Sequence, residues 1–184
     1  GLPMHPSIFF PYFPNFVSSA EDFIESYNHW SGAIVLTSDT SSGSLINNGP
    51  LWKYKLNDFD NIHLLDGLTQ LVRSYYLAGA EEIMVSASPT MHWNRNENVD
   101  IEEFLSKILS IKNQPYRLLL GSAHQMGTAR INPNPEQGVV DLDGKVHGLE
   151  NVYIVDASTF PRCSGVNPMI SIQSMSHFLM SKII

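Results

Sequence analysis

Cysteine is scarce in this sequence, because its 184 residues include only Cys163. One thiol cannot form a disulfide within the chain or supply a cysteine-rich metal site, and it mildly favours a reducing compartment. Lysine and arginine number 11 against 18 aspartates and glutamates, so the formal net charge is −7. The chain has no basic run that could neutralise the phosphates of a nucleic acid. Nucleic acid is therefore not a partner that we expect.

Long hydrophobic runs are also missing. No stretch of about 18 apolar residues is present to cross a bilayer. The beginning of the sequence shows no basic segment followed by an apolar one, so no signal peptide is visible. Because the first residue is Gly1 and not methionine, we expect the chain to be part of a longer polypeptide. With 43% hydrophobic and 16% charged residues, the composition is typical of a globular domain.

The local patterns that remain predict an α+β fold. The clearest element is a helix over residues 57–78, where apolar residues recur at helical spacing. Asp58 or Asp60 is available as its cap, and Gly79 stands where a helix should end. Residues 81–88 follow as a strand. A helix followed by a strand suggests an α/β or an α+β layer. For the architecture we expect α+β, with a mostly antiparallel sheet backed by helices.

Weaker patterns predict the other elements. We expect short helices over residues 18–30 and 100–109, short strands over 33–37 and 118–120, a buried strand over 151–156, an irregular polar segment over 88–100, and a largely buried C-terminal helix from residue 168. The sequence contains no internal repeat and no tract of low complexity. One domain of ordinary size accounts for this length.

The start of the last helix is the first candidate site. Residues 156–169 read DASTFPRCSGVNPM, in which Asn167 is a favoured N-cap and Pro168 suits the first helical position. A helix start presents unpaired N–H groups and the positive end of the helix dipole, so it stabilises a negatively charged ligand. Composition alone nevertheless favours the simpler interpretation, in which Asn167 and Pro168 only cap a helix.

The second candidate is His124, which lies among small residues in GSAHQMGTAR. Small neighbours allow a ligand to approach, and imidazole accepts protons near neutral pH. The sequence holds seven histidines, however, and spacing alone does not select this one. A hydrolase is a poor alternative, because Cys163 and Ser164 have no local base and no G-x-S-x-G motif occurs.

These motifs follow one another in a recognisable order. SAHQMGTAR precedes GVVDLDGKVHGLENVYIVDAS, which is followed by SGVNPM. In this order they resemble the C-terminal signature of the glucose-methanol-choline (GMC) flavoprotein oxidoreductases, over roughly residues 118–180. SAHQMG together with SGVNPM is most similar to the long-chain fatty alcohol oxidases. Several short motifs in one order rarely coincide by chance, so the resemblance outweighs the simple cap.

The resemblance implies an FAD-dependent enzyme that oxidises a long-chain primary alcohol to an aldehyde. It implies that His124 takes the hydroxyl proton while a hydride moves to flavin N5, and that Asn167 binds the same alcohol oxygen. O2 then accepts the electrons and becomes hydrogen peroxide, and protonated His124 stabilises the charge that develops on oxygen.

FAD contacts are implied for five positions. Asp156 and Ala157 would lie along the ribityl–pyrophosphate region of FAD. Asn167, Pro168 and Met169 would face the N1–C2=O edge of the flavin. The helix dipole at that edge would favour the anionic reduced ring.

The resemblance also implies a partner that these residues do not contain. No G-x-G-x-x-G motif is present, so we expect an N-terminal FAD-binding half elsewhere and no turnover by this chain alone. We divide the sequence into a loop-rich lead-in over 1–31 and a substrate-side domain over 32–184, in which 151–184 completes the FAD-binding side. Exposed apolar surface is expected where the missing half would pack.

Two alternatives stay open. The chain could belong to another GMC enzyme, such as a sterol oxidase or an alcohol dehydrogenase, or it could be a non-catalytic remnant without the dinucleotide-binding half. For the compartment we expect an intracellular setting, and the poor solubility of fatty alcohols favours a peroxisomal or membrane-associated one. The chain ends with Lys182-Ile183-Ile184 and so lacks a peroxisomal S-K-L terminus.

Overall fold

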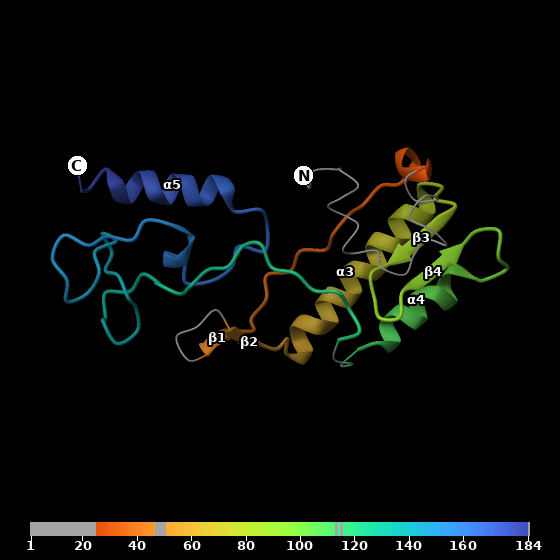
Figure 1. The fold of residues 1–184 in the computed structure, drawn as a ribbon, viewed down its shortest axis with the longest axis horizontal. Helices are drawn as coiled ribbons and strands as arrows, with labels where there is room; N and C mark the ends of the chain where they lie inside the picture. Colours follow the sequence, from red (N-terminus) through yellow and green to blue (C-terminus); the bar gives the residue numbers. More distant parts are fainter. Residues whose placement is uncertain (1–24, 47–50, 113, 115, 184) are drawn as a thin grey trace. The chain divides into compact units, whose positions relative to one another are not determined.

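A computed structural model describes residues 25–46, 51–112, 114 and 116–183 (Figure 1). The chain groups into two compact units. The first unit runs up to Val35 and resumes over Ser41–Leu120, and the second consists of Leu36–Thr40 together with Gly121 onward. The lead-in predicted over 1–31 and the start of the helix predicted over 18–30 lie largely outside the described residues. In the described part of that helix, residues 25–26 are α-helical and the 3-10 turn Tyr27–His29 follows.

The first unit contains the strands and two of the three long helices. Its elements are β1 (Gly43–Ile46), β2 (Leu51–Tyr54), α3 (Asp58–Leu77), β3 (Glu82–Val85), β4 (Met91–Asn94) and α4 (Ile101–Ser110). β1 pairs with β2 and β3 with β4, both in antiparallel register. Figure 1 shows α3 and α4 beside the β3–β4 hairpin. Small antiparallel sheets combined with helices confirm the predicted α+β class.

Helix α3 confirms the clearest prediction, although its cap differs from the expected one. The side chain of Asn57 accepts the N–H of Asp60 at 2.8 Å, so Asn57 and neither aspartate is the N-cap. Gly79 has φ +92°, a left-handed conformation that ends the helix at little cost for glycine. Asp60 is buried and accepts the backbone N–H of Ser41 at 2.8 Å as well as the Ser41 hydroxyl proton. The predicted apolar face is partly wrong, because Ile62 is exposed.

Strand β4 corrects the prediction of an irregular segment over residues 88–100. Trp93 lies opposite Ile83 in the hairpin, and both side chains are buried. The indole N–H of Trp93 donates to the carbonyl of Val99 at 3.0 Å, and its ring meets Tyr76 edge to face at 5.4 Å. A polar segment therefore forms a strand because one tryptophan packs into the core and keeps its N–H satisfied.

The core of the first unit lies between α3, α4 and the β3–β4 hairpin. Its buried members are Leu65, Val72, Ile83, Val85, Trp93, Ile101, Phe104, Leu105, Ile108 and Ile111. Asp100 caps α4 by accepting the N–H of Glu102 at 3.1 Å, as the sequence predicted. Arg73 of α3 donates to both carboxylate oxygens of Glu102, at 2.6 and 3.0 Å, and so links the two helices at the surface.

The second unit contains little regular structure. Its elements are a 3-10 turn, Ala157–Thr159, and helix α5, Met169–Met180. The buried strand predicted over 151–156 is wrong, because that segment makes a single bridge, Lys145 to Tyr153, and Asn151 has φ +59°. The strand predicted over 118–120 in the first unit is likewise reduced to one bridge, from Leu118 to Ala87. No strand forms over residues 33–37, all of which are described.

Helix α5 is much more exposed than its apolar sequence predicts. Leu179 is its one buried side chain, while Met169, Ile170 and Phe178 are all more than half exposed. The hydroxyl of Ser176 donates to the carbonyl of Val155, which ties the helix to the preceding loop. The prediction of a largely buried helix is therefore wrong. None of the helices in the described ranges combines the length and the hydrophobicity needed to cross a membrane.

Candidate active site

The start of α5 lies one residue later than the sequence predicted. The helix begins at Met169, and Pro168, expected inside the helix, occupies the cap position. Pro168 is buried, and its carbonyl accepts the N–H of Ile172 at 2.8 Å. Asn167 is exposed, and its side-chain oxygen accepts the N–H of Met169 at 3.3 Å. Asn167 thus covers one of the unpaired N–H groups while the amide end of its side chain stays accessible.

The first turn of α5 combines polar donors with apolar surface. It contains no acidic residue that would compete for the positive end of the helix dipole. Met169 and Ile170, at the same end, are 59% and 66% exposed. Hydrogen-bond donors beside exposed apolar side chains suit a planar, largely apolar ring with one anionic edge. These residues therefore fit the flavin edge that the resemblance assigns to them.

Asp156 shapes the 3-10 turn that it precedes. Its Oδ1 accepts the hydroxyl proton of Ser158 at 2.5 Å and the backbone N–H of Ser158 at 2.8 Å. These hydrogen bonds, the hydroxyl first, lower the pKa of the Asp156 carboxyl, so the group is an anion at neutral pH. An anionic carboxylate accepts hydrogen bonds from ribityl hydroxyls but repels pyrophosphate. Asp156 and the half-buried Ala157 therefore fit the ribityl chain better than the pyrophosphate.

The histidine loop runs into the same turn. The N–H of Ala129 donates to the carbonyl of Ser158 at 3.0 Å, and that of Ile131 to the carbonyl of Thr159 at 2.9 Å. His124, five residues before Ala129, is half-buried in irregular backbone. Within the described residues no hydrogen bond reaches its imidazole and none joins it to Asn167. The predicted pairing of His124 with Asn167 stays a prediction.

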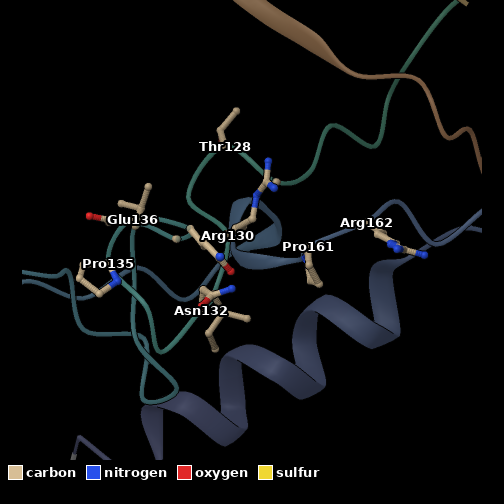
Figure 2. A pocket seen from close by; sticks show the side chains of 12 residues that line it. Thr128, Arg130, Asn132, Pro135, Glu136, Pro161 and Arg162 are labelled. Carbon is tan, nitrogen blue, oxygen red and sulfur yellow. The ribbon is translucent and has the colours of Figure 1, made fainter.

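An open pocket of about 750 Å³ lies in the second unit. It is lined by Gly127, Thr128, Arg130, Ile131, Asn132, Pro135, Glu136, Gln137, Gly138, Val139, Pro161 and Arg162. Figure 2 shows Pro135 and Glu136 on one side of the pocket and Arg162 on the other. None of the six residues singled out from the sequence lines it. Short motifs do not predict this pocket, because Pro135, Glu136 and Arg162 match none.

The wall of this pocket is fixed by main-chain contacts. The N–H of Asn132 donates to the carbonyl of Val140 at 2.9 Å, and the N–H of Val139 donates to the carbonyl of Arg130 at 3.0 Å. A Cβ on Gly138 would lie 2.5 Å from the Cβ of Asn132, so no other residue fits there without a shift. His147 makes a further hydrogen bond, from Nε2 to the carbonyl of Asn132 at 2.9 Å.

Comparisons with known proteins agree with the motifs. The family model described as GMC oxidoreductase matches residues 31–176. Long-chain-alcohol oxidase FAO4A of Arabidopsis thaliana is 31% identical over 182 residues, which are 95% of this chain and 24% of that protein. Long-chain-alcohol oxidase FAO3 of the same plant is 31% identical over 164 residues, 85% of this chain and 22% of that protein.

A third relative comes from a bacterium. The 6'''-hydroxyparomomycin C oxidase of Streptomyces lividus is 48% identical over 54 residues, 29% of this chain and 10% of that enzyme. The chain spans about a quarter of the length of the Arabidopsis relatives that it matches. The family match nevertheless covers most of the chain and includes both candidate motifs. This chain belongs to the GMC oxidoreductase family and corresponds to its C-terminal domain.

Proposed function

We propose that this chain is the C-terminal, substrate-side part of an FAD-dependent oxidase of long-chain primary alcohols. The observation that carries the proposal is the 31% identity to long-chain-alcohol oxidase FAO4A over 95% of the chain. A match of that extent includes the histidine loop, the Asp156 turn and the start of α5. The proposed reaction converts the alcohol to an aldehyde.

Two groups of this chain carry the proposed chemistry on the substrate. His124 accepts the hydroxyl proton of the alcohol, because imidazole exchanges protons near neutral pH and the side chain is half-buried among small residues. Asn167 holds the alcohol oxygen with its exposed amide, and its own oxygen stays bonded to the N–H of Met169. Fixing the oxygen beside the base orients the carbon that loses its hydride.

Other residues of the chain would hold FAD. The first turn of α5 stabilises negative charge on the flavin edge through its N–H groups, and Met169 supports the ring through apolar contact. Asp156 accepts hydrogen bonds from ribityl hydroxyls. Bound FAD would supply the hydride acceptor, and O2 would regenerate it with release of hydrogen peroxide.

The exposed apolar side chains of α5 support the proposal that the enzyme includes more chain than this. The twelve residues Met169–Met180 include no aspartate, glutamate, lysine or arginine, and His177 is the one side chain among them that can carry a charge. Only Leu179 of the twelve is buried. Apolar surface of this kind is usually covered in the complete protein. A chain that spans about a quarter of its relatives leaves ample sequence to cover it.

A second candidate function is the oxidation of a more polar alcohol. The 48% identity to 6'''-hydroxyparomomycin C oxidase, although limited to 54 residues, exceeds the identity to the plant enzymes. In this case the roles of His124 and Asn167 are the same and only the substrate differs. Dodecanol and a water-soluble amino-sugar alcohol, offered separately, distinguish the two candidates.

The test is anaerobic reduction of the full-length, FAD-loaded protein by dodecanol, followed as loss of the visible flavin absorption. Replacing His124 with alanine should slow reduction by about 10²–10⁴-fold, the usual contribution of a general base. His63→Ala is the matched control, because His63 is exposed on α3 and bonds only to the Phe59 carbonyl. It should reduce at the parent rate.

Three results would count against the proposal. A full-length protein that binds no FAD removes the oxidase assignment altogether. Reduction by the amino-sugar alcohol but not by dodecanol moves the assignment to the second candidate. Equal rates for the parent and His124→Ala exclude His124 as the base.

A further inference from the structure

Two segments of the second unit that are distant in sequence hold each other next to the start of α5. The thiol of Cys163 donates to Oδ1 of Asp39 at 2.9 Å. In the opposite direction, the hydroxyl of Ser38 donates to the carbonyl of Cys163 at 3.2 Å. The two contacts join positions more than 120 residues apart. We name this pair of contacts, between residues 38–39 and residue 163, the thiol clasp.

Beside the clasp, the backbone at Gly165 lies in close contact with Ser38. The φ of Gly165 is +69°, in the left-handed region, and a Cβ built there would lie 2.6 Å from the Cβ of Ser38 and 3.1 Å from its backbone nitrogen. Only glycine accommodates both the backbone angle and the neighbour. The loop before α5 therefore rests directly on the main chain of Ser38.

The chemistry of Cys163 suits the donor role that the clasp requires. A thiol donates only while it is protonated. Burial raises the pKa of the Cys163 thiol most, and the hydrogen bond to the Asp39 carboxylate raises it further. The group therefore stays neutral at physiological pH and is a poor nucleophile. Its contribution is the hydrogen bond to Asp39, whose carboxylate raises the pKa of the thiol and so does not activate it.

A short, internally bonded turn connects the clasp to Asn167. The hydroxyl of Ser164 donates to the carbonyl of Val166 at 2.5 Å, which tightens the turn. Asn167 follows at once and bonds to the N–H of Met169. Only Val166 lies between Gly165 and Asn167, so a displacement of Gly165 is transmitted to Asn167 with little slack to absorb it.

We propose that Asp39 is a positioning residue, which through its hydrogen bond to Cys163 fixes the loop that places Asn167. The inference deepens the proposed function and rests on it, because the place of Asn167 matters only if Asn167 binds the alcohol oxygen. Asp39 itself touches neither substrate nor cofactor in this assignment. Its effect is on the geometry of the group that does.

The experiment uses four single variants of the full-length, FAD-loaded protein and the double variant Asp39→Ala/Cys163→Ala. Asp39→Ala removes the carboxylate acceptor and leaves the main-chain carbonyl of residue 39, which the thiol also contacts at 3.5 Å. Cys163→Ala removes the donor. Cys163→Ser keeps a donor at nearly the same place and should restore the contact. Asp143→Ala is the matched control, because Asp143 makes its ion pair with Lys182 in the same unit, at 2.6 Å, and has no contact with the clasp.

The first measurement is anaerobic flavin reduction by dodecanol. Asp39→Ala and Cys163→Ala should each slow reduction by about 10-fold, a modest effect beside the 10²-fold that a misplacement of about 1 Å can cause. The double variant should be no slower than either single one, because both remove the same interaction. Cys163→Ser and Asp143→Ala should reduce near the parent rate. FAD content should be equal in all, which separates positioning from loss of the fold.

The second measurement does not depend on activity. Amide hydrogen exchange in the segment around residues 163–169 should accelerate in Asp39→Ala and Cys163→Ala but not in Cys163→Ser or Asp143→Ala. Unchanged exchange in Asp39→Ala would overturn the clasp as a fixing contact. Faster exchange together with an unchanged reduction rate would overturn its role in placing Asn167. If the parent is not reduced by dodecanol at all, the proposed function fails, and the exchange data still decide whether the clasp holds the loop.

Discussion

Replacing Gly165 with alanine should destabilise the second unit for two separable reasons. The first is conformational, because φ +69° places any L-residue in the left-handed region at a cost of about 1–2 kcal/mol. The second is steric, because the new Cβ would meet the Cβ of Ser38 at 2.6 Å and its nitrogen at 3.1 Å. Overpacking of this kind costs about 1–3 kcal/mol. The sum is about 2–5 kcal/mol.

Two other glycines of the same unit separate these contributions. Gly148 has φ +76° but no atom within 4 Å of a built Cβ, so Gly148→Ala should show the conformational cost alone. Gly121 has neither a positive φ nor a close neighbour. Gly121→Ala should therefore change the free energy of unfolding by less than about 0.5 kcal/mol.

The assay is urea denaturation followed by circular dichroism, with the free energy of unfolding compared among the three variants. The predicted order of destabilisation is Gly165→Ala, then Gly148→Ala, then Gly121→Ala. Adding Ser38→Gly to Gly165→Ala should recover part of the loss, because it removes the Cβ contact but leaves the backbone nitrogen of Ser38 in place. A Gly165→Ala variant that is no less stable than Gly148→Ala would show that the close approach of Ser38 does not exist in solution.

Two further predictions concern the core and the acid range. Ile108→Ala should lower the free energy of unfolding by about 2–5 kcal/mol, because Ile108 is fully buried. Its half-exposed neighbour Leu109 should tolerate alanine with a change of less than about 0.5 kcal/mol. Equal losses of stability for the two variants in thermal denaturation would refute this. Hydrogen bonds from Ser158 lower the pKa of Asp156 in the folded protein. The stability that the carboxylate contributes is therefore complete above about pH 4, the pKa of an ordinary aspartate in the unfolded chain. It is lost as the pH falls through the lower pKa of the folded state. Urea midpoints of the parent and Asp156→Asn should therefore converge in acid and keep a constant difference near neutral pH.

Local signals predicted the helices of the first unit well. The helix over residues 57–78 has a cap, a periodic apolar pattern and a glycine stop, and each of these signals acts on residues only a few positions away along the chain. The cap itself is ambiguous in the sequence, because Asn57 stands beside Asp58 and near Asp60, and asparagine caps a helix about as well as aspartate. β4 was missed for the opposite reason, because the segment around Trp93 becomes a strand only through pairing with β3 and burial of the indole.

Apolar sequence misled the prediction where the chain has no partner to pack against. Residues 151–156 and α5 are rich in apolar side chains, and both were expected to be buried. Tyr153 makes one bridge and Phe178 is half exposed, because burial needs a second surface that the described chain does not provide. Of the candidate site, sequence patterns placed the start of α5 to within one residue, but they did not predict the 3-10 turn that follows Asp156. They gave no sign of the thiol clasp, because hydrogen bonds between residues 38–39 and 163 leave no periodic pattern.

In the pocket of the second unit, the residues that fix the backbone of the wall are different from the side chains that line its edge. Its wall depends on main-chain hydrogen bonds and on the absence of a side chain at Gly138, while Glu136 and Arg162 stand exposed at its edge. Substitutions at those two positions can alter charge and shape without disturbing the scaffold. A lineage could therefore change the charge and shape of this surface in single mutational steps, each compatible with a folded protein. Sequence divergence among relatives should concentrate at the edge of the pocket and spare the glycine.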